Sequence, residues 1–207
     1  NYLQLEGLSL RLVPKIGVGA NEAYGIIGSG GVDTETAYDN IMNKWKWGNF
    51  DKERLHVDRS YLPSLQTMRV TMIRLARQLV TEGKKDKAIA LTDKYFEAFP
   101  SYNFQYDQFS AFMTDVYIRS DAKDKAAARI RDIAVSLEQQ LRFHSSLSPR
   151  FQSSYQQEQQ FTMSTAQNLM NMANDMKDDA LKNELNQLFG KYLPSSPGLP
   201  SLPGLQN

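Results

Sequence analysis

The chain of 207 residues contains no cysteine and only two histidines, His56 and His144. The absence of cysteine excludes disulfide bridges, thiolate zinc sites and cysteine nucleophiles, and it is compatible with both the cytosol and a bacterial periplasm. The two histidines are far apart in the sequence and have no neighbouring ligand residues, whereas metal sites use several nitrogen, sulfur or oxygen ligands. We therefore predict no metal ion and no other cofactor.

An excess of charge of one sign is also missing, because 24 Lys and Arg residues oppose 23 Asp and Glu residues and leave a formal net charge of +1. Proteins that bind nucleic acids use surplus basic side chains to neutralise phosphates, so we expect no nucleic-acid partner. No apolar run reaches the ~18 residues of a membrane-spanning helix. The chain begins without Met or a signal peptide, and we interpret it as a piece of a longer protein.

Catalytic motifs are absent as well. The glycine-rich stretch GIIGSGGVDTE at Gly25–Glu35 precedes a predicted helix, as phosphate-binding loops do. It lacks the Gly-Lys-Ser/Thr ending of a P-loop, and Asp33 and Glu35 would repel an anion there, so we interpret it as a flexible connector. The chain contains neither Gly-x-Ser-x-Gly nor His-Glu-x-x-His. We therefore expect no catalytic residue and no enzymatic activity in this chain.

Helical periodicity dominates the rest of the sequence. Residues 2–13 alternate weakly and predict a short strand or extended segment. Asp33 is predicted to cap a helix that ends at Gly48, with an apolar side formed by Tyr38, Ile41, Met42 and Trp45. From Ser60 onwards the pattern is almost wholly helical. Breaks are predicted at Gly83, Pro100, Ser120–Lys123 and Pro149, and the last helices at roughly 124–143, 151–174 and 178–192.

A short segment typical of a turn occurs three times, as KKDKA at Lys84–Ala88, AKDKA at Ala122–Ala126 and MKDDA at Met176–Ala180. Each copy lies between two amphipathic helices. Aligned on Gly83, Asp121 and Asp175, the copies place the Asp of each Lys-Asp pair (Asp86, Asp124 and Asp178) to cap the second helix. They also place Ala88, Ala126 and Ala180 where two helices approach closely. The alternative is a helical bundle in which similar connectors recur by chance.

The spacing of these turns is similar to that of tetratricopeptide repeats, whose period is ~34 residues. We therefore predict an all-α fold of tetratricopeptide-like helical hairpins, forming a superhelix or an irregular bundle, with a short extended, glycine-rich N-terminal segment. The predicted divisions are 1–58 as an N-terminal platform, 59–193 as the hairpin domain, and 194–207 as a Pro/Gly/Ser-rich tail that is extended or disordered. Hairpin repeats usually present a surface that binds a peptide or protein.

The stretch KWKWGN at Lys44–Asn49 offers the first candidate binding residues. Trp45 continues the apolar side of its helix and is expected in the core, whereas Trp47 lies about 200° further round. An exposed Trp47 could stack on a sugar ring while Lys44 and Asn43 bind its hydroxyl groups, although Trp is also common in ordinary interfaces. In the downstream aromatic cluster, Tyr106 and Phe109 are candidates for a peptide groove, and core packing is the alternative.

Three stretches together resemble the C-terminal soluble region of a bacterial family of polytopic membrane proteins of unknown function. They are NYLQLEGLSLRLVP, VDTETAYDNIMNKWKWGNF and RLARQLVTEGKKDKAIALTDKYFEAFP, and they cover about residues 1–100. That family is related in its membrane part to protein O-mannosyltransferases. The shared residues would form the platform that joins the soluble and membrane parts: Tyr2, Leu5, Glu6, Gly7, Arg11, Pro14, Asp33, Tyr38, Asn40, Asn43, Lys44 and Gly48.

The resemblance implies that membrane helices and catalytic carboxylates lie in a missing upstream part, and that this region is periplasmic. On this basis we expect a non-catalytic accessory domain of a glycosyltransferase-like membrane protein that binds a protein or acceptor substrate. Its partners would be a protein or peptide and the membrane-embedded part of the same chain. The alternatives are an interaction scaffold unrelated to glycosylation and a carbohydrate-binding module that uses Trp47.

Overall fold

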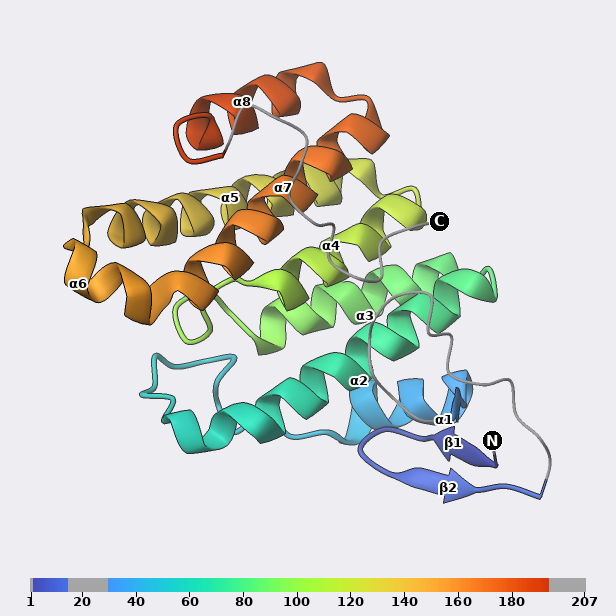
Figure 1. The fold of residues 1–207 in the computed structure, drawn as a ribbon. Helices are drawn as coiled ribbons and strands as arrows, with labels where there is room; N and C mark the ends of the chain where they lie inside the picture. Colours follow the sequence, from blue (N-terminus) through green and yellow to red (C-terminus); the bar gives the residue numbers. More distant parts are fainter. Residues whose placement is uncertain (1, 15–29, 194–207) are drawn as a thin grey trace. The chain divides into compact units, whose positions relative to one another are not determined.

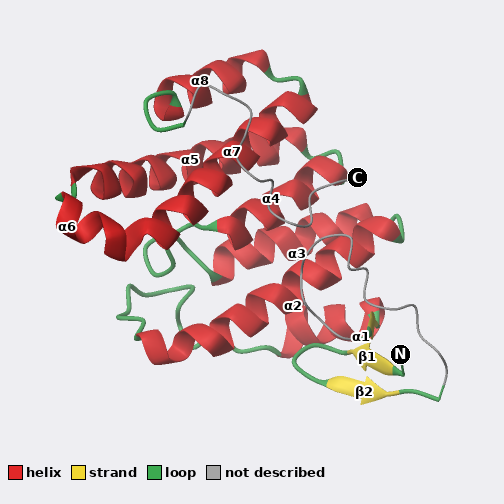
Figure 2. Cartoon of the chain, viewed as in Figure 1, coloured by secondary structure: helices red, strands yellow, loops and turns green. Residues whose placement is uncertain are grey.

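The computed structural model describes residues 2–14 and 30–193 (Figure 1). Helices make up most of these residues, and the strands among them are short (Figure 2), which confirms the predicted all-α class. The chain divides into two compact units between Phe104 and Gln105. The predicted boundary at residue 58 lies inside the first unit, because the long helix that follows it packs against the elements before it. The predicted tail 194–207 is outside the described residues.

The first unit begins with a small sheet of strand order β2-β1-β3. Its strands are β1 (Leu3–Leu5), β2 (Leu10–Leu12) and β3 (Gly31–Val32). β1 pairs antiparallel with β2 and parallel with β3. The segment 2–13, predicted as one extended stretch, is therefore a β-hairpin. Gly30 has φ +82°, and a Cβ at this position would lie 2.2 Å from the Leu3 carbonyl oxygen, so only glycine permits this approach of the chain to β1.

Helix α1 (Thr34–Asp39) follows β3 directly, and Asp33 caps it as predicted by accepting a hydrogen bond from the Thr36 backbone N–H at 3.0 Å. The helix continues as the π turn η2 (Asn40–Lys44). It ends there and not at Gly48, since Trp45 already has extended backbone angles. The extended backbone brings the rings of Trp45 and Trp47 to 5.6 Å from each other, whereas a helix would place them far apart. Aromatic packing thus overrides helical continuation.

The remainder of the first unit is a helical hairpin. After the short turn η3 (Arg59–Tyr61), helix α2 (Leu62–Thr81) packs against α3 (Lys85–Ala98). The side chains between them include fully buried apolar residues from both helices: Met72, Leu75, Ala76, Leu79, Ala88, Leu91 and Tyr95. Helix α2 also contacts α1 and β3, and this packing joins the hairpin to the sheet.

The second unit contains two further hairpins. Its elements are α4 (Gln108–Arg119), α5 (Lys123–Ser146), α6 (Pro149–Gln152), η4 (Ser153–Tyr155), α7 (Gln156–Met176) and α8 (Asp179–Phe189). Helix α7 packs against α4, α5 and α8. The predicted helices are confirmed with shifted ends, because helix ends are set by caps and turns that periodicity does not reveal.

All three repeated turns close their helices in the same way. Gly83, Asp121 and Lys177 adopt left-handed backbone angles, with φ of +73°, +64° and +57°. In each case the next backbone N–H bonds to the carbonyl five residues earlier: Lys84 to Leu79 at 2.8 Å, Ala122 to Tyr117 at 2.8 Å and Asp178 to Ala173 at 3.2 Å. This is the Schellman pattern of helix ends, and it confirms a hairpin at each copy. A tetratricopeptide-like superhelix stays a prediction.

The predicted alignment of the third copy is wrong by two residues, because its left-handed residue is Lys177 and not Asp175. Ala180 consequently lies at an exposed position, whereas Ala88 and Ala126 are fully buried. The predicted caps also differ. Asp178 does cap α8 by accepting from the Leu181 N–H at 2.9 Å.

Asp86 and Asp124 do not cap their helices. They lie in the first turn, after Lys84 and Ala122 at the cap positions. At that position the positive end of the helix dipole still stabilises their negative charges.

Candidate functional site

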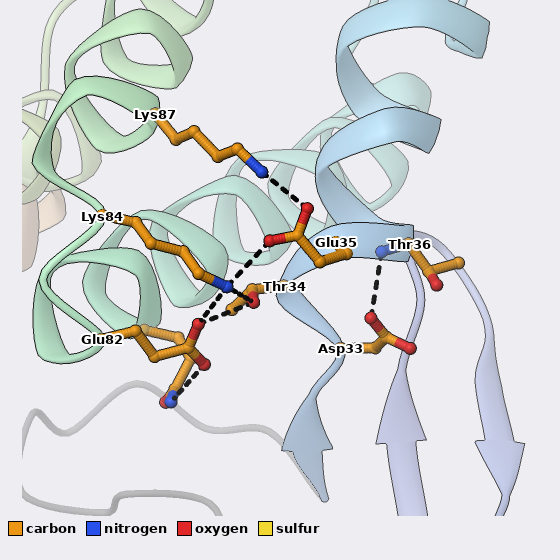
Figure 3. A network of polar contacts seen from close by, with 8 residues as sticks. Asp33, Thr34, Glu35, Thr36, Glu82, Lys84 and Lys87 are labelled. Atoms are coloured by element: carbon orange, nitrogen blue, oxygen red, sulfur yellow. Dashed lines mark hydrogen bonds and ion pairs between the residues drawn. The ribbon is translucent and has the colours of Figure 1, made fainter.

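The first copy of the repeated turn forms a polar network with α1 (Figure 3). Lys84 Nζ lies 2.9 Å from Thr34 Oγ1, 2.8 Å from Glu35 Oε1 and 2.7 Å from Glu82 Oε2. Lys87 Nζ binds the second oxygen of Glu35 at 2.6 Å. Thr34 in turn donates to Glu82 Oε2 at 2.8 Å. The network joins the start of α1 to the α2–α3 turn.

Charge pairing in this network shifts the pKa values of Glu35, Glu82 and Lys84 in favour of their ionised forms. Hydrogen bonds from Lys84 and then Lys87 lower the pKa of Glu35 to about 2. The pKa of Lys84 is raised by its hydrogen bonds to Glu35 and Glu82. For Glu82, burial acts to raise the pKa, but the hydrogen bonds from Lys84, Thr34 and Gln78 outweigh it and the pKa is lowered. A general acid or base needs a pKa near the working pH, so the arrangement is suited to holding α1 in place.

Trp47, the first predicted binding residue, lies in an aromatic cluster. Its ring centroid is 5.6 Å from that of Trp45 and 5.9 Å from that of Phe99, and Lys94 Nζ is 5.9 Å from its centre. Both tryptophans are half-buried. The expectation that Trp45 lies in the core is therefore wrong, whereas Trp47 keeps part of its ring exposed as the sequence predicted. Packing accounts for much of the remaining Trp47 surface.

Asn43 and Lys44 are engaged within their own turn. Asn43 Nδ2 donates to Asp39 Oδ1 at 2.8 Å, while Lys44 Nζ lies 2.6 Å from Asp39 Oδ2 and 2.9 Å from Asn40 Oδ1. These bonds, first from Lys44 and then from Asn43, lower the pKa of Asp39. A ligand at this turn would have to compete with them.

Tyr106 and Phe109, the other candidates, belong to the second unit. Tyr106 is buried, and its backbone carbonyl accepts a hydrogen bond from Gln140 Nε2 at 3.1 Å. Phe109 is half-buried at the start of α4, where Asp107 caps the helix by accepting from the Phe109 N–H at 3.0 Å. Phe104, only two residues before Tyr106 in the sequence, packs in the first unit at 5.2 Å from Phe99. The predicted aromatic cluster is thus divided between the two units.

An aromatic patch that sequence reasoning missed lies where α5 turns into α7. We define it as Phe143, Phe151 and Tyr155, whose side chains are 50%, 53% and 39% exposed. The rings of Phe143 and Tyr155 meet edge to face at 5.9 Å. Phe151 is four residues before Tyr155, on the short helix α6 that leads into the 3-10 turn η4. The sequence did contain one indication of this patch. Phe143 lies outside the row of buried apolar side chains of α5 that includes Leu141.

His144 lies beneath this patch. Its side chain is only 8% exposed, and its ring centroid is 5.7 Å from that of Phe143 and 6.1 Å from that of Tyr155. Burial lowers its pKa, although Glu158 acts in the opposite direction. Phe161 near the start of α7 is 46% exposed, while Leu169 and Met172 further along the helix are buried. The start of α7 is thus more open than this later part of the helix.

A second apolar surface lies on the β1–β2 hairpin of the first unit. Leu8, Leu10 and Leu12 are 56%, 45% and 75% exposed, and Tyr2, which is 52% exposed, lies next to Leu3 on the other face of the hairpin. Large apolar side chains that gather on a surface often mark an interaction site.

Within residues 2–14 and 30–193, no group of three or more His, Asp or Glu side chains could hold a metal ion. Nor does any helix in these ranges have the length and apolar character needed to cross a membrane. No protein-family model, curated protein or solved structure matches the chain.

Proposed function

We propose that this chain is a non-catalytic docking domain that binds a protein partner through the aromatic patch of its second unit. We further propose that it belongs to the periplasmic part of a membrane protein related to protein O-mannosyltransferases, where the bound partner would be an acceptor substrate. The aromatic patch carries the first proposal, and the resemblance of about residues 1–100 supports the second.

The composition of the patch and its rim fits protein recognition. Aromatic side chains and Arg dominate the binding energy of protein interfaces, and the sequence neighbours Arg142 of Phe143 and Arg150 of Phe151 are exposed. The adjoining segment is rich in Ser and Gln, whose side chains can donate and accept hydrogen bonds in several arrangements. Three rings kept in water gain the free energy of burial only when a partner covers them. A partner that covered the patch would therefore gain this free energy of burial.

The test is site-specific crosslinking in the full-length parent protein, expressed in its native cells. A photoreactive amino acid at Phe151 should give a discrete adduct with an acceptor protein. The adduct should be lost in the Phe143→Ser/Tyr155→Ser double variant, because the patch then lacks its neighbouring rings. Tyr61 is 57% exposed in the first unit, so the same probe at Tyr61 is the matched control and should give no such adduct.

Equal labelling at Phe151 and Tyr61 would overturn docking at the patch. Sugar transfer or hydrolysis by the purified chain alone would overturn the non-catalytic assignment. A parent reading frame without membrane spans would overturn the link to glycosylation and favour the interaction scaffold.

A further inference from the structure

Strand β2 is an edge strand whose outer side pairs with no other described strand. The opposite edge of the sheet differs, because α2 packs against β3 and Arg74 Nη2 donates to the Gly30 carbonyl at 2.7 Å. β1 lies between the two and is paired on both sides. Edge strands offer unpaired N–H and C=O groups to other chains, and proteins usually cover or charge them. Within residues 2–14 and 30–193, β2 is thus the open edge of this sheet.

The backbone groups at this open edge belong to Leu10 and Leu12. The Val13 N–H donates to the Tyr2 carbonyl at 2.8 Å, and the Glu6 N–H donates to the Ser9 carbonyl at 3.0 Å. Hydrogen-bonded and non-hydrogen-bonded pairs alternate along an antiparallel ladder. With Leu12 opposite Leu3 and Leu10 opposite Leu5, these two residues fall at non-hydrogen-bonded pairs. Their N–H and C=O groups therefore point away from β1.

The side chains of Leu10 and Leu12 extend the apolar face of the sheet. Side chains alternate between faces along a strand and match across a pair, so both leucines share a face with Leu3 and Leu5. Leu5 is only 5% exposed, whereas Leu10 is 45% and Leu12 is 75% exposed. The apolar face therefore continues beyond the part that its own unit covers.

The one charge on β2 does not protect the edge. Arg11 points to the other face, where its Nε lies 2.9 Å from Glu6 Oε1. A second copy of the chain fits this edge poorly, because two antiparallel β2 strands with full overlap would place Arg11 opposite Arg11, and like charges in that position destabilise the pairing.

We propose that β2 binds an extended segment of a partner polypeptide as an added strand, with apolar side chains at alternate positions of that segment. The outward N–H and C=O groups of Leu10 and Leu12 match an extended backbone. The exposed leucines select alternate apolar residues on the partner. This site lies in the first unit and is independent of the aromatic patch.

The probe is a set of fluorescent hexapeptides in which Val, Leu or Ile alternates with Thr, measured by fluorescence polarisation with the purified chain. Leu12→Pro removes an outward N–H that bonds nothing in the sheet, and proline is tolerated at such edge positions. We expect Leu12→Pro to weaken binding at least about fivefold, as for loss of a buried hydrogen-bond partner. Leu10→Ser/Leu12→Ser should weaken it through the lost apolar face. Circular dichroism checks that each variant is folded.

Two controls make the result specific. N-methylation of alternate peptide amides should abolish binding, because it blocks one edge of the peptide backbone. Phe143→Ser/Tyr155→Ser should bind the peptides like the unmodified chain. The proposal is overturned if no peptide of the set binds, or if Leu12→Pro and the N-methylated peptides leave affinity unchanged. Concentration-dependent dimerisation that Leu12→Pro abolishes would overturn it in favour of a second copy.

Discussion

The α2–α3 and α4–α5 turns have nearly the same sequence and the same backbone geometry, but they serve their units differently. Both end a helix with one left-handed residue, Gly83 or Asp121, and a hydrogen bond from the next N–H. Lys84 then reaches three acceptors around α1, whereas the equivalent residue of the second turn is Ala122, whose methyl group cannot bind a carboxylate. The shape of the turn is thus a local property, and its connection to the unit depends on one side chain.

The α7–α8 turn extends the comparison, because it reaches the same geometry with a different residue alignment. Its left-handed residue is a lysine, and its helix begins with a true side-chain cap from Asp178. Similar short sequence segments therefore do not guarantee that their residues occupy equivalent positions in the structure.

The largest effect is expected from filling the small positions of these hairpins. Ala88→Leu and Ala126→Leu should each lower the free energy of unfolding by about 1–3 kcal/mol, since both sites are fully buried and added methyl groups strain a packed core. Ala180→Leu should change it by less than ~0.5 kcal/mol, because the site is exposed. Urea unfolding measures all three. A large loss at Ala180 would show that the third copy aligns as its sequence suggests.

A smaller effect is expected from exchanging the left-handed residues. Gly83→Ala should lower the free energy of unfolding by about 1 kcal/mol, because a side chain disfavours left-handed angles. Lys177→Gly should raise it by a similar ~1 kcal/mol for the same reason. Thermal unfolding of the two variants gives the comparison. Shifts of the same sign would contradict a common geometry for the two turns.

The smallest effect concerns the pH dependence that Lys84 confers on the first turn. The pKa of Glu35 is about 2 in the folded chain, against an ordinary value of 4.5. The carboxylate therefore stabilises the fold above about pH 4.5, and this contribution is lost as the pH falls towards 2. Lys84→Met should raise the pKa of Glu35 and reduce the loss of stability in acid, as NMR titration of the carboxyl group can show. Ala122→Met, the matched change in the second turn, should leave that pKa unaltered.

Sequence periodicity predicted the helices and the three hairpins because both depend on residues close in the chain. The Asp33 and Asp178 caps were predictable for the same reason, as each accepts a hydrogen bond from the backbone N–H three residues further along, in the helix that it caps. The early end of the helix before Trp45 was not, since the extended backbone there packs Trp47 against Phe99, the residue that follows α3.

The candidate binding residues show the same division. Trp47, Asn43 and Lys44 were chosen for their side-chain chemistry, but their neighbours in the fold already engage them. The aromatic patch and the open edge of β2 became visible only with burial and strand pairing, because exposure is a property of the folded chain. The position of Phe143 outside the buried apolar row of α5 is the one indication of the patch that the sequence contained.

The sheet has a consequence for the order in which the first unit forms. Each helical hairpin forms between two helices that are adjacent in the sequence. It can therefore assemble as soon as both helices have been synthesised. β1 must instead wait for β3, which begins at Gly31, and for Arg74 of α2 to bind the Gly30 carbonyl. Closing that longer loop carries a greater entropic cost. β1, the first strand of this unit in the sequence, is therefore among the last of its elements to be fixed, and its edge stays open until β3 pairs with it.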